Sequence, residues 1–479
     1  MIRISQRLHL RFSVEWVLAT AVVLGVLRVA YLAYTRGYLP QPFFFEPSDT
    51  FADWFNPSHW AGNAGTYDTY RSLYPPISFV FQNFFRIDSC YDTNAVDFSA
   101  GLAARSCDWA GIGAIFGLWT LNVVLVYLSY RKWMPNRAVV RTIAVALGFP
   151  MLNAVERGNM VLATFACTVL AWGPLLRSST LRMFFAGCAI NFKVYILAAL
   201  LPMILKRDWR RVELGLICTV IVYLVTYAIL GRGSLFQIAD NIASFSNLVP
   251  QTPLDIWMVG SYAPMVELIK NDRFPSVLIL GSGWRDFLVV FLPALVRTAQ
   301  VTILLAFVAI ALRPEVIPRY RVIALGILFA EISSEAGAYA IVFHTFFVLM
   351  EPWRGAGRKL AIIVCYLTAL AIEIPVQDVA PVTRDSYISQ TSIIVNYYVG
   401  LTPFLRPATT ILVGVILAFV TIGSVFADVR HQGWSNRWRF HRDLQPLPWI
   451  KRPVAPTVRR SESSPLNNQR PEANRPVIE

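Results

Sequence analysis

Charged side chains are scarce in this sequence. Of its 479 residues, 15% are charged and 56% are hydrophobic, and the mean hydropathy is +0.50. Soluble domains carry about a quarter charged residues, so the main solvent of this chain is lipid. The net charge of +14 does not indicate nucleic-acid binding, because Lys and Arg stand in short groups between apolar runs.

Two kinds of binding motif are missing. The sequence has no Gly-rich loop of the kind that holds nucleotide phosphates and no His/Cys group with zinc-site spacing. We therefore expect no cofactor. The sequence gives no support for a metal site, since two nearby carboxylates are too few to define one, and it leaves a metal requirement open.

Cysteine is sparse as well. The six cysteines do not form a disulfide scaffold, because four stand in or beside apolar runs as small hydrophobes: Cys167, Cys188, Cys218 and Cys365. Cys90 and Cys107 share one polar loop. Their placement leaves open whether they form an oxidised pair or remain thiols.

The sequence contains several apolar runs of about bilayer length. They lie at about 14–34, 110–130, 212–230, 287–312, 360–375 and 409–427. Shorter runs lie at about 138–154, 160–176, 183–192, 194–205, 321–333 and 338–352. The sequence predicts an all-α polytopic membrane protein with a bundle of about 12 transmembrane helices. The first run lacks a cleavage site and is expected to remain as a signal anchor.

The basic residues predict an orientation. Short loops rich in Lys and Arg stay cytoplasmic, and such groups recur on one side of the predicted bundle. The long loops at about 35–109, 231–286 and 374–408 then face the periplasm or exterior. We expect a multi-pass protein of the cell membrane, in bacteria the inner membrane, with both termini in the cytoplasm.

The chain divides into two parts. Residues 1–428 are predicted to form the transmembrane domain, and residues 429–479 a basic, Pro/Ser-rich cytoplasmic tail with too little apolar surface to fold. No internal repeat is evident, which disfavours inverted-repeat transporters.

Paired carboxylates mark the first outer loop. Asp49 and Asp53 are four residues apart and share one face if the segment is helical. Against a membrane cavity, one could act as general base for a hydroxyl while the other orients it. The alternative is a solvated acidic loop with aromatic membrane anchors.

Four short motifs that follow the paired acids carry a family resemblance. These acids are followed by Tyr67-Asp68 and Tyr74-Pro75-Pro76, then by Glu156-Arg157-Gly158-Asn159, and then by the segment from Ala189 to Tyr195. Their order resembles the GT-C superfamily of polyprenyl-phosphate-sugar-dependent glycosyltransferases, and most closely family 87, typified by mannosyltransferases of phosphatidylinositol mannoside synthesis. The resemblance covers roughly residues 14–352. One departure is that Asn159 follows Gly158 without the Gln that the family often shows.

The resemblance implies a GT-C-like bundle with helical extracytoplasmic loops and an inverting hexosyltransferase, with mannose as the type sugar. Its partners would be a polyprenyl-phosphate sugar donor, a lipid or glycan acceptor and the membrane, without nucleic acid. The catalytic base would be Asp49 or Asp53, with Asp49 favoured. The expected substrate-binding residues are Tyr74, Glu156, Arg157, Asn159, Lys193, Glu335 and His344.

Several of these residues have alternative interpretations. Lys193 could snorkel from a short turn, Arg157 could pair locally with Glu156, and Glu335 could merely end a helix. His344 stands in an apolar run, where a packing histidine is the commoner case. For the whole chain, the rival functions are a lipid-linked sugar flippase or other transporter, and a non-catalytic scaffold.

Overall fold

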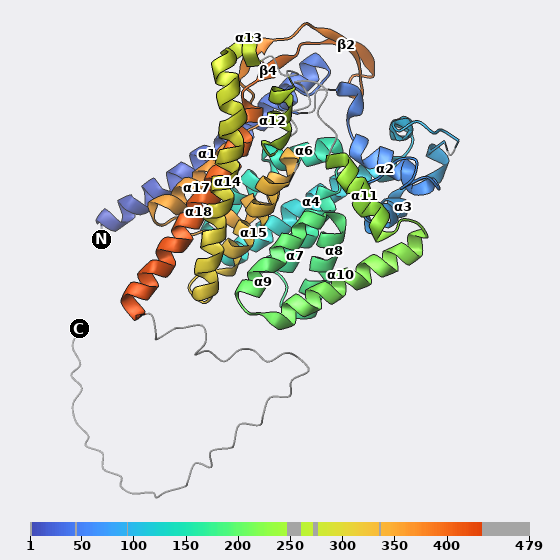
Figure 1. Cartoon of the computed structure of the whole chain (residues 1–479). Helices are drawn as coiled ribbons and strands as arrows, with labels where there is room; N and C mark the ends of the chain where they lie inside the picture. The colour runs from blue at the N-terminus through green and yellow to red at the C-terminus, as the bar shows by residue number, and fades with distance from the viewer. Residues whose placement is uncertain are drawn as a thin grey trace, which may run out of the picture.

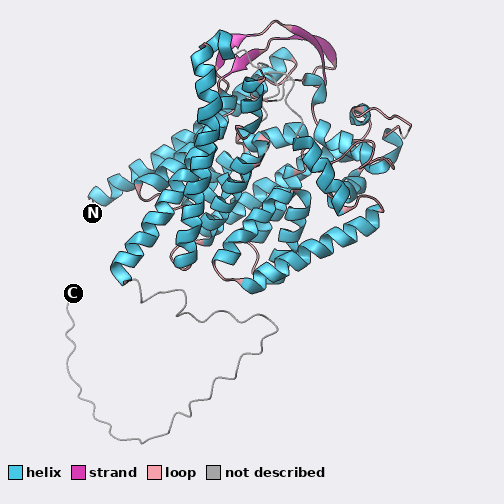
Figure 2. Ribbon diagram, viewed as in Figure 1, coloured by secondary structure: helices cyan, strands magenta, loops and turns pink. Residues whose placement is uncertain are grey.

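The computed structural model describes residues 2–43, 46–92, 94–246, 260–271, 276–334 and 337–433. Most of them are helical, as Figures 1 and 2 show. The α-helices are α1 Ile2–Arg36, α2 Ala52–Gly62, α3 Pro76–Phe85, α4 Trp109–Trp133, α5 Ala138–Ala146, α6 Phe149–Arg157, α7 Val161–Trp172, α8 Ser179–Phe192, α9 Leu201–Leu205, α10 Trp209–Leu230, α11 Leu235–Ser246, α12 Ala263–Lys270, α13 Ser276–Leu280, α14 Ser282–Leu312, α15 Arg319–Ser333, α16 Ile341–Val348, α17 Ala356–Thr368 and α18 Thr402–Gln432. Short 3-10 helices are η1 Pro47–Asp49, η2 Asp88–Cys90, η3 Ala100–Ser106, η4 Pro135–Arg137, η5 Val194–Leu200 and η7 Ala338–Ala340.

Five helices of the described residues are long and apolar enough to cross a membrane. They are the Val14–Arg36 part of α1, and α4, α10, α14 and α18, with a sixth if the bent pair across Pro135–Arg157 is one span. The prediction of about 12 spans is not confirmed. The apolar run at 160–176, for example, forms a helix of 12 residues, α7, whereas a straight span needs about 20.

The bent pair has a local cause. α5 and α6 meet at 44°, and Pro150 lies in the first turn of α6, where it has no N–H to continue the hydrogen bonding of α5. The Phe149 N–H instead donates to the Ala369 carbonyl at 2.8 Å. The break therefore joins α6 to the segment that follows α17.

α10 shows how the long helices meet their surroundings. Large apolar side chains are exposed along it: Leu216, Ile217, Val220, Ile221, Leu224, Val225 and Ile229. A soluble protein does not leave such a surface in water, whereas lipid tails solvate it at no cost. With the comparable apolar surfaces of α14 and α18, this identifies a membrane protein.

The late outer segment departs from the helical loops predicted for it. β1 (Pro375–Asp378) pairs antiparallel with β4 (Tyr398–Gly400), and β2 (Val382–Ser386) with β3 (Thr391–Val395). The β-branched run of β3 favours an extended backbone. The hairpin lies against the first outer loop, where the Tyr387 N–H donates to the Pro47 carbonyl at 3.2 Å and Arg384 Nε lies 2.9 Å from Glu46.

The predicted outer loops gather at one end of the bundle. In Figure 1, α2, α3, α11, α12 and the strands lie towards the top and right, whereas the turn from α9 to α10 and the C-terminal end of α18 lie at the lower edge. At that edge, α18 continues to Gln432, past the predicted domain boundary at residue 428. The tail from residue 434 onward lies outside the described residues.

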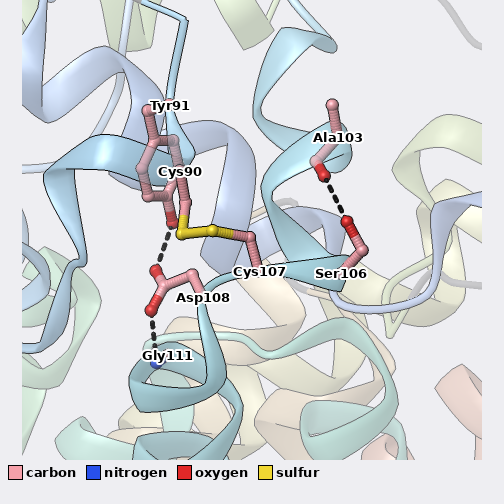
Figure 3. The surroundings of a disulfide bond; sticks show 7 residues. All are labelled: Cys90, Tyr91, Ala103, Ser106, Cys107, Asp108 and Gly111. Atoms are coloured by element: carbon pink, nitrogen blue, oxygen red, sulfur yellow. Dashed lines mark hydrogen bonds between the residues drawn. A yellow bond between two sulfur atoms is a disulfide. The ribbon is translucent and has the colours of Figure 1, made fainter.

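A disulfide closes the first outer loop. Cys90 and Cys107 are bonded, which decides between the two alternatives that the sequence left open (Figure 3). The neighbouring Asp108 accepts a hydrogen bond from the Gly111 N–H at 3.0 Å and one from the Tyr91 hydroxyl at 2.7 Å. The bridge therefore holds the loop onto the N-terminal end of α4.

We expect removal of this disulfide to destabilise the protein. Closing a loop of 17 residues is worth about 3 kcal/mol in the chain-entropy description. Thermal unfolding of the purified Cys90→Ser/Cys107→Ser variant should therefore show a lower midpoint, and reductant should lower the wild-type midpoint similarly. Cys218→Ala, which removes a free cysteine, is the control. Equal midpoints for the double variant and the wild type would contradict the expectation.

Candidate active site

Asp53 is held at both carboxylate oxygens. It lies in the first turn of α2, where its Oδ1 accepts a hydrogen bond from Arg157 Nη2 at 2.7 Å and its Oδ2 accepts one from Asn159 Nδ2 at 2.7 Å. Burial on its own would raise the pKa of Asp53. The charge of Arg157 and the hydrogen bonds from Arg157 and Asn159 outweigh burial and hold the pKa below its usual range.

The turn between α6 and α7 supplies both partners of Asp53. Gly158 follows α6 with a φ of +63°, a left-handed conformation that suits glycine, and a Cβ there would lie 2.8 Å from the Cβ of Trp54. Asn159 Oδ1 accepts from the Val161 N–H at 3.0 Å, which leaves its amide nitrogen facing Asp53. The left-handed backbone of Gly158 and the hydrogen bond between Asn159 and the start of α7 therefore orient the side chains of Arg157 and Asn159 towards Asp53.

Phe51 attaches the start of α2 to the end of α6. It precedes α2 with a φ of 65°, a left-handed backbone that costs a non-glycine residue about 1–2 kcal/mol. Its N–H donates to the Glu156 carbonyl at 2.8 Å, and its ring packs edge-on against Phe116 and Tyr387. These contacts hold the strained residue and bring α2 onto the end of α6.

Asp49 is the more open of the two acids. It ends η1, its side chain is 33% exposed against 23% for Asp53, and its Oδ2 lies 3.8 Å from Arg157 Nη1. Burial raises the pKa of Asp49, the charge of Arg157 opposes the rise, and the Asp53 carboxylate adds to it. The two neighbouring acids thus have pKa values shifted in opposite directions, which is the pattern of a base beside a permanently charged partner.

Sequence analysis missed two residues that support Asp49. Arg105 Nη1 donates to the carbonyls of Ser48 and Thr50, at 2.6 and 2.7 Å, and its guanidinium lies 4.5 Å from the ring centroid of Tyr387. Both residues lie in polar loops that the sequence predicts to face outward. Nothing in their spacing signals that they meet around Asp49.

Lys193 lies in the same cluster of residues. It follows α8, and its Nζ lies 4.7 Å from the ring centroid of Tyr74 and 5.7 Å from that of Tyr339. Burial lowers the pKa of Lys193 to about 8, and the charge of Asp53 opposes this shift. Among the described residues, Lys193 Nζ has these aromatic faces but no hydrogen-bond acceptor. Lys193 is therefore a cation placed beside the acids rather than one extending away from them.

Glu156 has a structural setting. It is buried, and its Oε2 accepts a hydrogen bond from Asn153 Nδ2 at 3.3 Å. Its charge acts on the guanidinium of Arg157, which also donates hydrogen bonds to the first outer loop at Asp49 and Asp53. The Glu156 backbone carbonyl receives the Phe51 N–H. Glu156 therefore holds the turn that presents Arg157, and the described contacts do not place it on the open side with Asp49.

No contact among the described residues brings His344 to this cluster. His344 is buried in α16, with its Nδ1 2.5 Å from Glu331 Oε2, and no contact among the described residues joins this pair to Asp49 or Asp53. Glu335 lies outside the described residues. Within the described ranges, no group of three or more His, Cys, Asp or Glu residues is arranged to hold a metal ion.

Comparison with known proteins identifies the family. The model of glycosyltransferase family 87 matches residues 73–334, more than half of the chain, including Tyr74, Arg157, Asn159 and Lys193. No curated protein and no solved structure matches the chain. The match confirms the resemblance drawn from the order of the short motifs. Together with the long apolar helices, this match shows that the chain belongs to glycosyltransferase family 87 and is a membrane glycosyltransferase.

Proposed function

We propose that the protein transfers a hexose, with mannose the first candidate, from a polyprenyl-phosphate donor to a hydroxyl of a lipid or glycan acceptor at the outer face of the cell membrane. Asp49 is the general base and Asp53 positions Arg157. The observation that carries this assignment is the asymmetry of the acids: Asp53 is bound at both oxygens, whereas Asp49 is more exposed and has a raised pKa.

The proposed reaction is a single displacement at the anomeric carbon of the donor sugar. Asp49 takes the acceptor hydroxyl proton, the hydroxyl oxygen forms a bond to the anomeric carbon, and the bond from that carbon to the phosphate oxygen breaks with inversion. The departing phosphate gains negative charge. Lys193 can receive this charge, since an ammonium group has three N–H donors and this one has no acceptor among the described residues.

The disulfide supports the proposed orientation. Disulfides persist in the periplasm and outside the cell, and Cys90–Cys107 lies in the same loop as Asp49 and Asp53. The basic loops that follow α4 and α9 lie in short connections, as cytoplasmic loops do. These two observations favour an active site on the non-cytoplasmic face.

The rival function is movement of a lipid-linked sugar across the membrane without bond formation. Release of polyprenyl phosphate from a radiolabelled polyprenyl-phosphate mannose separates the two functions, since transport leaves the donor intact.

We expect Asp49→Asn to lower turnover of that donor by about 100-fold or more, which is the usual contribution of a general base. The unfolding midpoint should change little. Asp53→Asn should instead lower both turnover and stability, the latter by about 2 kcal/mol, because it removes the charged carboxylate that is hydrogen-bonded to the buried Arg157. Asp92→Asn, an exposed acid of the same loop, is the matched control. Full turnover in both active-site variants would overturn the assignment.

We also expect turnover to fall as the pH rises through about 8. Lys193 is a cation below its pKa and loses its charge above it, so stabilisation of the leaving phosphate is lost on the alkaline side. Lys193→Arg, which stays charged, should move this alkaline limb to higher pH even if the maximal rate falls. An unchanged pH profile in this variant would exclude a role for the Lys193 charge.

Orientation can be measured by labelling. A thiol reagent that does not cross membranes should label Ala64→Cys in intact cells and should label Arg210→Cys only after permeabilisation. Both positions are exposed, and they lie in segments on opposite sides of the predicted bundle. The reverse pattern would place the acids in the cytoplasm.

A further inference from the structure

A second polar site lies at the other end of the helices that carry the active site. Asn159 stands at the N-terminal end of α7 and Trp172 at its C-terminal end, and 12 helical residues span about 18 Å. Beside Trp172 lies a small hollow of about 30 Å³ that opens to the surface. Its walls are Trp172, Arg182, Met183, Pro202, Met203, Lys206, Asp208, Arg211, Arg319 and Ile323.

The charges around this hollow are unbalanced. Four cations line it with one carboxylate, Asp208, which Arg211 and Arg319 share at 2.7 and 3.3 Å. Arg182 donates to the carbonyls of Ala171 and Gly173, and Lys206 to those of Pro314 and Ile317, so these four acceptors are neutral. Burial and the charge of Arg319 lower the pKa of Lys206 to about 8. Cations gathered in this way repel one another until an anion joins them.

A buried donor in the same wall also lacks a partner. Trp172 is 5% exposed, and its indole N–H has no hydrogen-bond acceptor among the described residues. A buried N–H without an acceptor costs roughly 1–3 kcal/mol. An anionic oxygen in the hollow would accept from Trp172 and from the cations at once. A preference for basic cytoplasmic loops explains the number of cations here but not their convergence on one hollow with an unpaired N–H.

The surroundings of the hollow point to lipid. Trp209, which begins α10, is partly exposed, as is common for tryptophan at a membrane interface. Exposed apolar side chains continue from this level along α8, at Leu181 and Phe184, and along α10, at Leu216 and Ile217. Met183, Met203 and Ile323 provide an apolar wall inside the hollow. A molecule that puts a phosphate among the cations would thus have its acyl chains beside apolar helix surfaces.

We propose that this hollow binds the phosphate of an anionic membrane lipid, at the face of the membrane opposite Asp49 and Asp53. The site is independent of the donor and acceptor of the transfer reaction, and its occupancy is measured without turnover.

The test is a titration of the purified full-length protein in neutral detergent with phosphatidylglycerol, phosphatidylcholine or inorganic phosphate, read as the midpoint of thermal unfolding. Phosphatidylglycerol should raise the midpoint saturably, and the other two should not. Arg319→Gln should need about fivefold more phosphatidylglycerol for half of the effect, since one cation near a lipid surface contributes about that factor. Arg210→Gln, an exposed cation of the same loop outside the hollow, should match the wild type.

Trp172→Phe provides a second variant that keeps an aromatic side chain in place. Loss of its N–H should weaken the phosphatidylglycerol effect about tenfold, whereas a merely structural Trp172 would shift the midpoint without lipid and leave the titration unchanged. Equal stabilisation by phosphatidylglycerol and phosphatidylcholine would overturn the proposal. So would identical titrations of the wild type, Arg319→Gln and Trp172→Phe. Stabilisation by inorganic phosphate at the same concentrations would assign the hollow to a soluble phosphate compound and reject the lipid.

Discussion

The contact of Asp53 with Arg157 and Asn159 joins the first outer loop to the helix bundle, and the rest of the active site depends on it. A charged acid in a setting of low polarity is stable only when its oxygens are satisfied, and here two side chains from one turn satisfy both. The same pairing distinguishes the settings of the two acids. Burial raises the pKa of Asp49 at a more open position beside Arg157, and the charge of Asp53 adds to the rise.

Much of this site could be predicted from sequence, because its chemistry is local. Asp49 and Asp53 stand in one short segment, and Arg157 and Asn159 flank a glycine whose conformation turns both towards α2. The contributions of Arg105 and Tyr387 could not be predicted. They meet through tertiary packing of two loops 282 residues apart, and neither has a neighbouring motif. His344 contacts the buried Glu331, and its role in substrate binding remains a prediction.

The fold was predictable to a similar degree. Hydropathy located five of the long helices, because a run of about 20 apolar residues is rare outside membrane-spanning helices. The number of spans was not predictable from runs such as 194–205, where a 3-10 helix, η5, and a short α-helix, α9, share one apolar segment. The strands at 375–400 were missed because the family resemblance implied helical outer loops, although Thr391–Val395 has a strand-like composition.

The long separation along the chain between Asp53 and Arg157 has a consequence for biosynthesis. Synthesis is sequential, so the acid leaves the ribosome 104 residues before the cation that neutralises it, and the hairpin around Tyr387 follows more than 200 residues later. During insertion the first outer loop must therefore remain hydrated until α6 arrives. Its disulfide needs only residues up to Cys107, so the loop can gain a covalent constraint before its electrostatic one.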